Sequence, residues 1–398
     1  MTMIRQDSFR RILVAFFGIF CVVALTTIEA VSSDSEKIQN DLISWVRSKG
    51  GSFSDKIEIR RVNPEDPTSY MGVFVREPIE AKESLFVIPR DCFIHVFDTA
   101  ETQQTNNEAD DISYETYNAD LCKLANKLMN EMKLGEKSEY APYVAYLQTQ
   151  KPGQLPVNWS QQGKDLLRKV AIPGSPMVDW IDWNFRSEAN KCIEPKKNES
   201  GKISFEEHMV EMTIQRCFDV ALIPIWDMVN HDNGRINTEN DSMYDEEGMK
   251  VRALRKLEKG EELFASYDLC LDCKDLVEYW GTPEILKDFG FVENYPHRWV
   301  FSEQEIWIEI WWDYALEDFA MLLYFSGVKD GPPSAKQLEF LKSELYRLES
   351  VSLERQEGIS DHEYQTIERF HDAAMMDLDA VVDFLAPKDY DDDTTGEL

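Results

Sequence analysis

Positive charge is scarce in this sequence. Its 398 residues include 42 Lys and Arg against 74 Asp and Glu, which gives a formal net charge of −32. Such an average field repels phosphate and leaves no basic footprint for DNA or RNA, so we expect no nucleic-acid partner. The negative charge remains compatible with a cationic protein partner. The chain has 43% apolar residues and 10 Trp, a composition that predicts a large ordered core.

The motifs of several common enzyme classes are also missing. The sequence contains no GxGxxG or GxGxG turn, no P-loop and no GxSxG elbow, which argues against dinucleotide sites and serine hydrolases. Structural zinc usually takes four ligands in two close pairs. Cys270 and Cys273 form one CxxC, whereas Cys192 and Cys217 stand alone in the sequence. We therefore predict no metal, and interpret the CxxC as a local disulfide or two unpaired thiols, with a lumenal compartment favouring the disulfide.

The N-terminus has the order of a secretory leader. Arg5, Arg10 and Arg11 precede a run of 14 apolar residues, Ile12–Leu25, and small residues follow. The run is short for a membrane span, which needs about 20 residues. We predict a signal peptide over residues 1–30, with a signal anchor as the alternative, and no stable span after its removal. This predicts the secretory pathway or a membrane-delimited organelle, with cytosol or plastid as alternatives.

The spacing of apolar residues divides the chain into two β-rich parts around a helical one, with a helical end. Strands are predicted over 56–62, 72–75, 84–88, 220–225, 250–254 and 262–267, and a Trp-rich hairpin over 298–311. The predicted parts are an N-terminal helix with the first β part over 34–98, a helical insertion over 99–215, the second β part over 216–283, a mostly helical C-terminal domain over 284–387 and an acidic tail over 388–398. This α+β layout is neither βαβ-periodic nor an all-β sandwich.

Three polar residues follow an apolar run in the segment IPIWDMVNHDNGRIN, residues 223–237. They are Asp227, Asn230 and His231. Polar side chains at the end of a buried strand need hydrogen-bond partners, and a ligand would supply them. We therefore take this segment as the candidate site.

Several segments resemble, in the same order, the SET-domain protein methyltransferases, in the branch of the Rubisco large-subunit lysine methyltransferase and the actin-histidine methyltransferase. Residues 220–234 resemble the family's IPL-x-D-x-x-NH block, and residues 257–268 resemble its GE-x-(hydrophobic)-x-x-x-Tyr segment. Similar segments also lie at 70–75, 79–89, 42–51, 141–156 and 204–218. The resemblance implies a β-rich SET fold with a helical insertion, followed by a substrate-binding domain over 284–385.

The resemblance also implies that S-adenosylmethionine is the cofactor. The side chain of Asn230 would lie near its methionine part, the backbone of His231 near adenine, and an aromatic ring would cover the adenine. The implied cofactor residues are Met71, Gly72, Val73, Asp227, Asn230, His231 and Phe291.

At the other end of the implied site, Tyr267 matches the catalytic tyrosine, with Arg216 and Trp226 as substrate-binding residues. The implied activity is N-methylation of a protein, with lysine as the predicted target. Histidine is the alternative, because Trp226 precedes Asp227 as in the actin-histidine enzyme; Arg216 in place of its Asn favours lysine. We expect a monomer that acts on a protein substrate.

Three positions depart from the family pattern. Tyr70 stands where the family has its first opening Gly, and Phe74 and Ile214 stand where relatives carry Arg. A Gly at position 70 would let the cofactor approach the backbone, and the two Arg would supply positive charge. Their replacement would weaken cofactor binding, so a catalytically inactive SET-like module that binds a protein is a further alternative.

Overall fold

The computed structural model describes residues 36–66, 69–96, 114–171, 192, 203–218, 220–241, 247–267, 281–313 and 318–386. The predicted leader, the CxxC of Cys270 and Cys273 and the acidic tail lie outside these residues. Over the described part of the chain, no helix has the length and apolar character needed to cross a membrane.

The chain alternates short strands with helices. The helices are residues 36–48, α2 (Tyr114–Leu134), α3 (Ala141–Leu147), α4 (Gln161–Val170), α7 (Phe205–Arg216), α8 (Thr282–Phe289), α9 (Ala335–Glu349) and α10 (Asp361–Leu385). The strands are β1 (Ser52–Phe53), β2 (Ile57–Arg61), β3 (Met71–Val75), β4 (Ser84–Ile88), β5 (Ile94–His95), β6 (Cys217–Phe218), β7 (Ala221–Leu222), β8 (Asn230–His231), β9 (Thr238–Asn240), β10 (Met249–Ala253), β11 (Phe264–Ala265), β12 (His297–Phe301), β13 (Ile306–Asp313), β14 (Asp318–Phe325) and β15 (Val328–Lys329).

The first lobe is built from several small sheets around one apolar core. Their strand orders are β1-β4-β10-β9, β2-β3 and β5-β7-β6, and β8 pairs with β11 in parallel. Alternate residues of β10 are buried, because successive side chains of a strand point to opposite faces. The helix at 36–48 and helices α2, α3 and α7 contribute to the same core.

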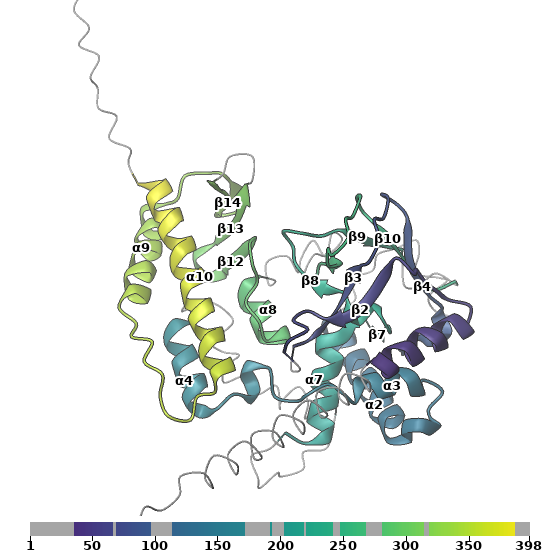
Figure 1. Cartoon of the computed structure of the whole chain (residues 1–398). Coiled ribbons are helices and arrows are strands. Elements are labelled where there is room, and N and C mark those ends of the chain that lie inside the picture. The colour runs from purple at the N-terminus through teal and green to yellow at the C-terminus, as the bar shows by residue number, and fades with distance from the viewer. Residues whose placement is uncertain are drawn as a thin grey trace, which may run out of the picture.

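The second lobe combines the antiparallel sheet β12-β13-β14-β15 with helices α9 and α10 (Figure 1). The predicted Trp-rich hairpin is confirmed, since His297–Phe301 pairs with Ile306–Ile310. Strand β14 was not predicted and lies in a stretch expected to become helical. Its apolar run DFAMLLYF is short and fits either a buried strand or a helix segment by periodicity, so only its pairing with β13 decides.

The helical insertion contributes to both lobes. Helices α2 and α7 pack with the first core, whereas Leu166, Leu167 and Val170 of α4 belong to the core of the second lobe. Glu363 of α10 accepts hydrogen bonds from the backbone N–H and hydroxyl of Ser160, at 2.7 and 2.8 Å, and so fixes the start of α4. In Figure 1, α4 lies beside α10, on the opposite side of the molecule from α2 and α3.

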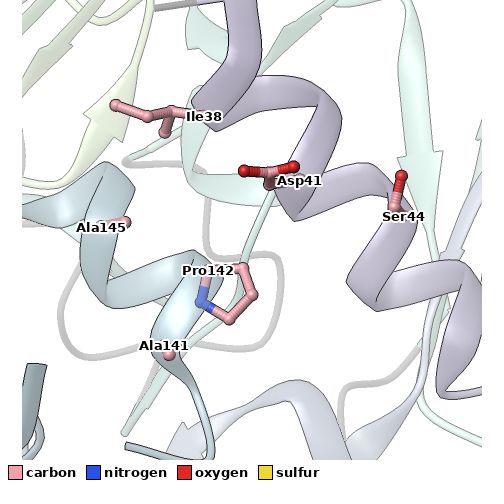
Figure 2. A pocket seen from close by; sticks show the side chains of 6 residues that line it. All are labelled: Ile38, Asp41, Ser44, Ala141, Pro142 and Ala145. Atoms are coloured by element: carbon pink, nitrogen blue, oxygen red, sulfur yellow. The ribbon is translucent and has the colours of Figure 1, made fainter. Parts of the chain in front are cut away.

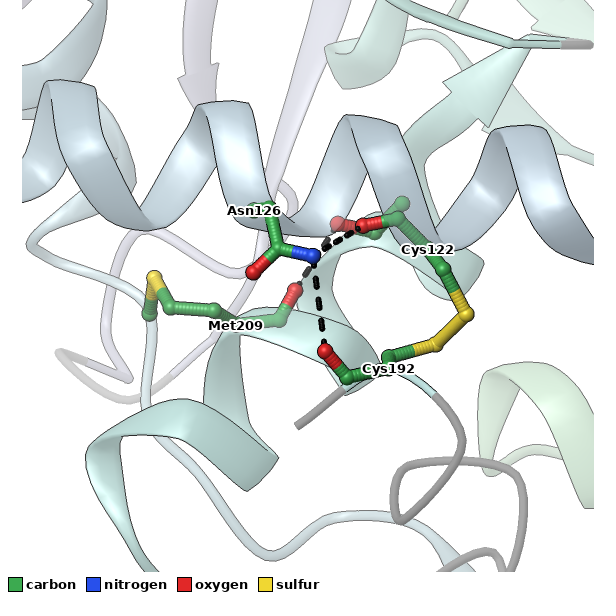
Figure 3. The surroundings of a disulfide bond; sticks show 5 residues. Cys122, Asn126, Cys192 and Met209 are labelled. Carbon is green, nitrogen blue, oxygen red and sulfur yellow. Dashed lines mark hydrogen bonds between the residues drawn. A yellow bond between two sulfur atoms is a disulfide. The ribbon is translucent and has the colours of Figure 1, made fainter. Parts of the chain in front are cut away.

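A disulfide joins Cys122 of α2 to Cys192, across a sequence separation of 70. The side-chain amide of Asn126 donates hydrogen bonds to both cysteine carbonyls, at 2.9 Å to Cys122 and 3.4 Å to Cys192 (Figure 3). Cys192 stands alone in the sequence, so spacing along the chain gave no sign of this pair.

A pocket of about 410 Å³ separates the helix at 36–48 from α3. Figure 2 shows the residues that line it, Ile38, Asp41, Ser44, Ala141, Pro142 and Ala145. None of the residues predicted to bind cofactor or substrate lines this pocket.

Candidate active site

The segment predicted as a strand over 220–225 is shorter than expected. Strand β7 ends at Leu222, because Pro224 has no N–H to continue the ladder and Ile225 turns the chain with φ of 68°. Positive φ is a strained conformation for a β-branched residue. The strand prediction was therefore wrong beyond Leu222, and Trp226 and Asp227 instead begin the 3₁₀ turn η5 (Trp226–Met228).

Asn230 links this segment to the opening strand β3. Its side-chain nitrogen donates to the carbonyl of Met71 at 3.0 Å and to Oε1 of Glu262 at 2.6 Å. Between them, Gly72 has no room for a side chain: an added Cβ would collide with Glu262 Oε1 and lie 3.0 Å from Asn230 Nδ2. The backbone of β3, at Val73, accepts a further bond from the N–H of Leu263 at 2.8 Å.

His231 connects the predicted catalytic tyrosine to the loop after α8. The backbone N–H of Tyr267 donates to His231 Nδ1 at 2.9 Å, so the ring proton is on Nε2. This Nε2 donates to Glu293 Oε1 at 2.7 Å, and Thr282 donates to Glu293 Oε2 at 3.1 Å. The side chains of His231 and Glu293 are almost fully buried. Glu293 thereby selects the tautomer of His231 that receives the Tyr267 backbone.

Aromatic rings form one wall beside these hydrogen bonds. The ring of His231 lies 5.1 Å from that of Tyr267 and 5.9 Å from that of Phe291. The ring of Phe289 lies 4.8 Å from that of Tyr267. The phenol of Tyr267 donates to the carbonyl of Val229 at 3.0 Å, and burial raises its pKa well above the usual range. The phenol is therefore neutral and held in one orientation.

Arg216 and Asp227 form a buried ion pair at the end of α7. The guanidinium contacts the Asp227 carboxylate at 3.3 Å and its carbonyl at 3.2 Å, and also binds the side chain of Gln150. Tyr143 donates to Asp227 Oδ2 at 3.0 Å, and Tyr146 accepts from Arg216 at 3.1 Å. The side-chain partners of Asp227 thus come from α3 and α7, on the side of the predicted substrate residues, although the resemblance assigned Asp227 to the cofactor.

The Asp227 side chain is fully buried, and its Oδ1 has no hydrogen-bond partner among the described residues. Burial raises the pKa of this carboxyl to about 6, although Arg216 and Tyr143 oppose the shift. Trp226 is buried next to this pair and meets the ring of Phe218 edge-on, with centroids 5.9 Å apart.

Three contributors were missed at the sequence level. Glu262 lies inside the segment resembling the family's Tyr block, but the resemblance implies no role for it, nor for Tyr143 or Glu293. A polar residue that the core encloses needs a partner, yet the sequence does not say which residue provides it. The departures Tyr70 and Phe74 have opposite environments: Tyr70 is exposed, and Phe74 is buried below the guanidinium of Arg60.

Most of the site lies within residues 70–268, which match the SET domain family, while Phe289, Phe291 and Glu293 follow that range. The match covers half of the chain, and the protein belongs to the SET domain family.

Among individual proteins, the chain is similar to one described as N-lysine methyltransferase setd6, from Danio rerio. The two are 23% identical over 288 residues, which is 65% of this chain and 58% of that relative. The chain therefore matches less than two thirds of the relative's length.

Two solved structures of the enzyme described as LSMT share the fold. One has bound lysine and AdoHcy, with a TM-score of 0.51, 11% identity, and coverage of 88% of this chain and 91% of that chain. The other, Rubisco LSMT with sinefungin and monomethyllysine, has a TM-score of 0.51, 13% identity, and coverage of 87% and 91%.

Proposed function

We propose that this protein is an S-adenosylmethionine-dependent protein N-methyltransferase that acts on lysine. The observation that carries the proposal is the hydrogen-bonded assembly of Asn230, His231 and Tyr267 with the opening strand. Membership of the SET family, and similarity to a relative named as an N-lysine methyltransferase, support it.

The residues present fit the cofactor. Gly72 lets the side chains of Asn230 and Glu262 approach the backbone of β3 closely, since an added Cβ would collide with Glu262. Phe291 is only partly buried, with its ring 5.9 Å from the buried ring of His231, and provides aromatic surface for a flat adenine ring. The polar groups around Asn230 suit the amino-acid part of S-adenosylmethionine.

When bound, S-adenosylmethionine supplies an electrophilic methyl group on a sulfonium. The chain must then align the target nitrogen with that methyl and exclude water. Tyr267 is suited to orient the nitrogen, because its proton is committed to the Val229 carbonyl and its oxygen lone pairs remain available. Trp226 and Phe218 provide apolar surface on the acceptor side.

A target lysine must also lose its proton, starting from a pKa of about 10.4. Apolar surroundings disfavour the ammonium form. The nearby carboxylate of Asp227 is already paired with Arg216, so it holds no free negative charge to stabilise an ammonium. This internal pairing supports delivery of a neutral lysine.

The proposal is tested by two measurements on the full chain. Isothermal titration should show binding of S-adenosylmethionine, and mass spectrometry should find methylated lysines in proteins incubated with enzyme and cofactor. Absence of binding by folded protein would reject the enzyme and favour the inactive binding module. Methylation confined to histidine would reject lysine as the target, but the protein would still be a protein N-methyltransferase.

We also propose that the protein acts in an oxidising compartment of the secretory route. Disulfides persist mainly in such compartments, and the Cys122–Cys192 bond supports the location that the leader predicts. A fusion of residues 1–40 to a fluorescent reporter should enter the secretory route, and the reporter alone should not. A diffuse cytosolic signal from the fusion would reject this location.

A further inference from the structure

Glu262 places a half-buried carboxylate beside the opening strand, within hydrogen-bond reach of Asn230. Its Oε1 accepts from Asn230 Nδ2 at 2.6 Å, and the same nitrogen donates to the Met71 carbonyl at 3.0 Å. An amide nitrogen has two hydrogens, so both donors of Asn230 are engaged. Any further ligand of this pair must therefore be a hydrogen-bond donor, because only Asn230 Oδ1 and the Glu262 carboxylate can still form hydrogen bonds, and both are acceptors.

The nearest cations do not neutralise this carboxylate. Arg60 and Arg235 lower the pKa of Glu262 from a distance, but burial dominates and raises it. Arg60 pairs with Glu58 at 3.3 Å, and Arg235 pairs with Asp232 at 2.6 Å. Within the described part of the chain, neither arginine forms an ion pair with Glu262. Among these residues, Glu262 is therefore hydrogen-bonded to the neutral Asn230 and has no direct countercharge.

We propose that Glu262 binds the α-ammonium group in the methionine part of S-adenosylmethionine. This inference rests on the proposed function and assigns one cofactor contact to a residue of this chain. An ammonium has three donors and no acceptor, which complements an acceptor pair made by Glu262 and Asn230. Because Gly72 has no side chain, Glu262 and Asn230 both lie close to the backbone of β3 and meet at one point. Charge-assisted hydrogen bonds are among the strongest polar contacts in proteins.

The test removes first the ammonium group of the ligand and then the carboxylate of Glu262. Isothermal titration compares S-adenosylhomocysteine with its desamino analogue, in which hydrogen replaces the ammonium, on wild type and Glu262→Gln. Wild type should bind S-adenosylhomocysteine at least about tenfold more tightly than the analogue, as expected for a charged hydrogen bond. Glu262→Gln should lose about tenfold for S-adenosylhomocysteine and little for the analogue.

Glu261→Gln is the matched control. Its neighbouring carboxylate pairs with Arg255 at 2.8 Å and accepts from the backbone of Glu258, away from Asn230. This variant should keep the wild-type preference between the two ligands.

Three outcomes would overturn the assignment. They are an unchanged affinity of Glu262→Gln for S-adenosylhomocysteine, an equal loss for both ligands, and equal binding of both ligands by wild type. The wild-type comparison needs no variant, so it decides the matter even if Glu262→Gln unfolds. A folded wild type that binds neither ligand would overturn the proposed function itself.

Discussion

The two ends of the candidate site balance their buried charge in different ways. At the end proposed to receive the acceptor, Asp227 pairs directly with Arg216. At the cofactor end, Glu262 and Glu293 accept hydrogen bonds from the uncharged side chains of Asn230 and His231. At the proposed acceptor end the carboxylate is thus paired with a cation, whereas Glu262, at the proposed cofactor end, forms no ion pair with Arg60 or Arg235 and can accept from a cationic ligand.

This difference suits the two molecules that the site is proposed to bind. The side chain of a target lysine must be neutral before it attacks the methyl group. An unpaired carboxylate beside it would stabilise the ammonium form and so slow the reaction. S-adenosylmethionine keeps its positive charges throughout binding, so uncompensated acceptors are useful there. Four substitutions test this difference between the two ends of the site.

Tyr267→Phe should have the largest effect. The phenol oxygen is fixed by its bond to Val229, so its loss should lower the methyl-transfer rate about 10³-fold, within the range of positioned acid–base groups. The ring remains, so affinity for S-adenosylhomocysteine should stay near wild type. Single-turnover rates and calorimetry measure the two quantities. Tyr324→Phe, on β14, is the control, and an unchanged rate in Tyr267→Phe would remove that residue from its role.

Asp227→Asn should change how stability depends on pH. The folded pKa of about 6 lies above the ordinary value of 3.8, so the protonated carboxyl favours folding. Its contribution to the unfolding free energy is present below about pH 4 and is lost as the pH rises to about 6, by about 3 kcal/mol. Denaturant unfolding of both proteins between pH 4 and 7 measures this effect: the unfolding free energy of wild type minus that of the variant should fall as the pH rises. A flat difference would contradict the raised pKa.

Glu293→Leu should cost about 2 kcal/mol of stability, because the buried Nε2–H of His231 loses its acceptor. Glu293→Gln keeps an acceptor oxygen and should cost less. In the Leu variant, the ring-nitrogen chemical shifts of His231 should also differ from those of a ring protonated only on Nε2. Retention of that pattern at wild-type stability would show that Glu293 does not position His231.

Gly72→Ala should have the smallest effect, about tenfold in affinity for S-adenosylhomocysteine. The added Cβ collides with Glu262 and crowds Asn230, so it disturbs the acceptors at the cofactor end. Gly260→Ala is the control: its φ of +93° strains an alanine, but the space around it is open. Calorimetry should show lost affinity in the first variant alone, and equal losses would contradict a local effect.

Much of the secondary structure follows from local patterns. The strand predicted over 84–88 is β4 (Ser84–Ile88), and α10 (Asp361–Leu385) lies in the domain predicted to be mostly helical over 284–387. The prediction over 220–225 failed where Pro224 and the positive φ of Ile225 end the strand. Strand β14 was missed because a short apolar run is ambiguous until a partner strand pairs with it.

Parts of the site were less predictable for a different reason. Asn230, His231 and Tyr267 stand in segments with a recognisable order of residues. Glu293 gives no such signal, because its importance comes from a partner 62 positions away. The Cys122–Cys192 bond likewise joins residues 70 positions apart with no local spacing to mark them.

The sequence alone determined the family, the order of its motifs and the residue types that bear the proposed chemistry, because these depend on short segments read along the chain. The tertiary structure decided the pairing of charges: Asp227 with Arg216, and Glu262 and Glu293 with neutral donors. Hydrogen bonds and ion pairs depend on distances of a few ångströms, and only the folded chain brings these distant residues that close.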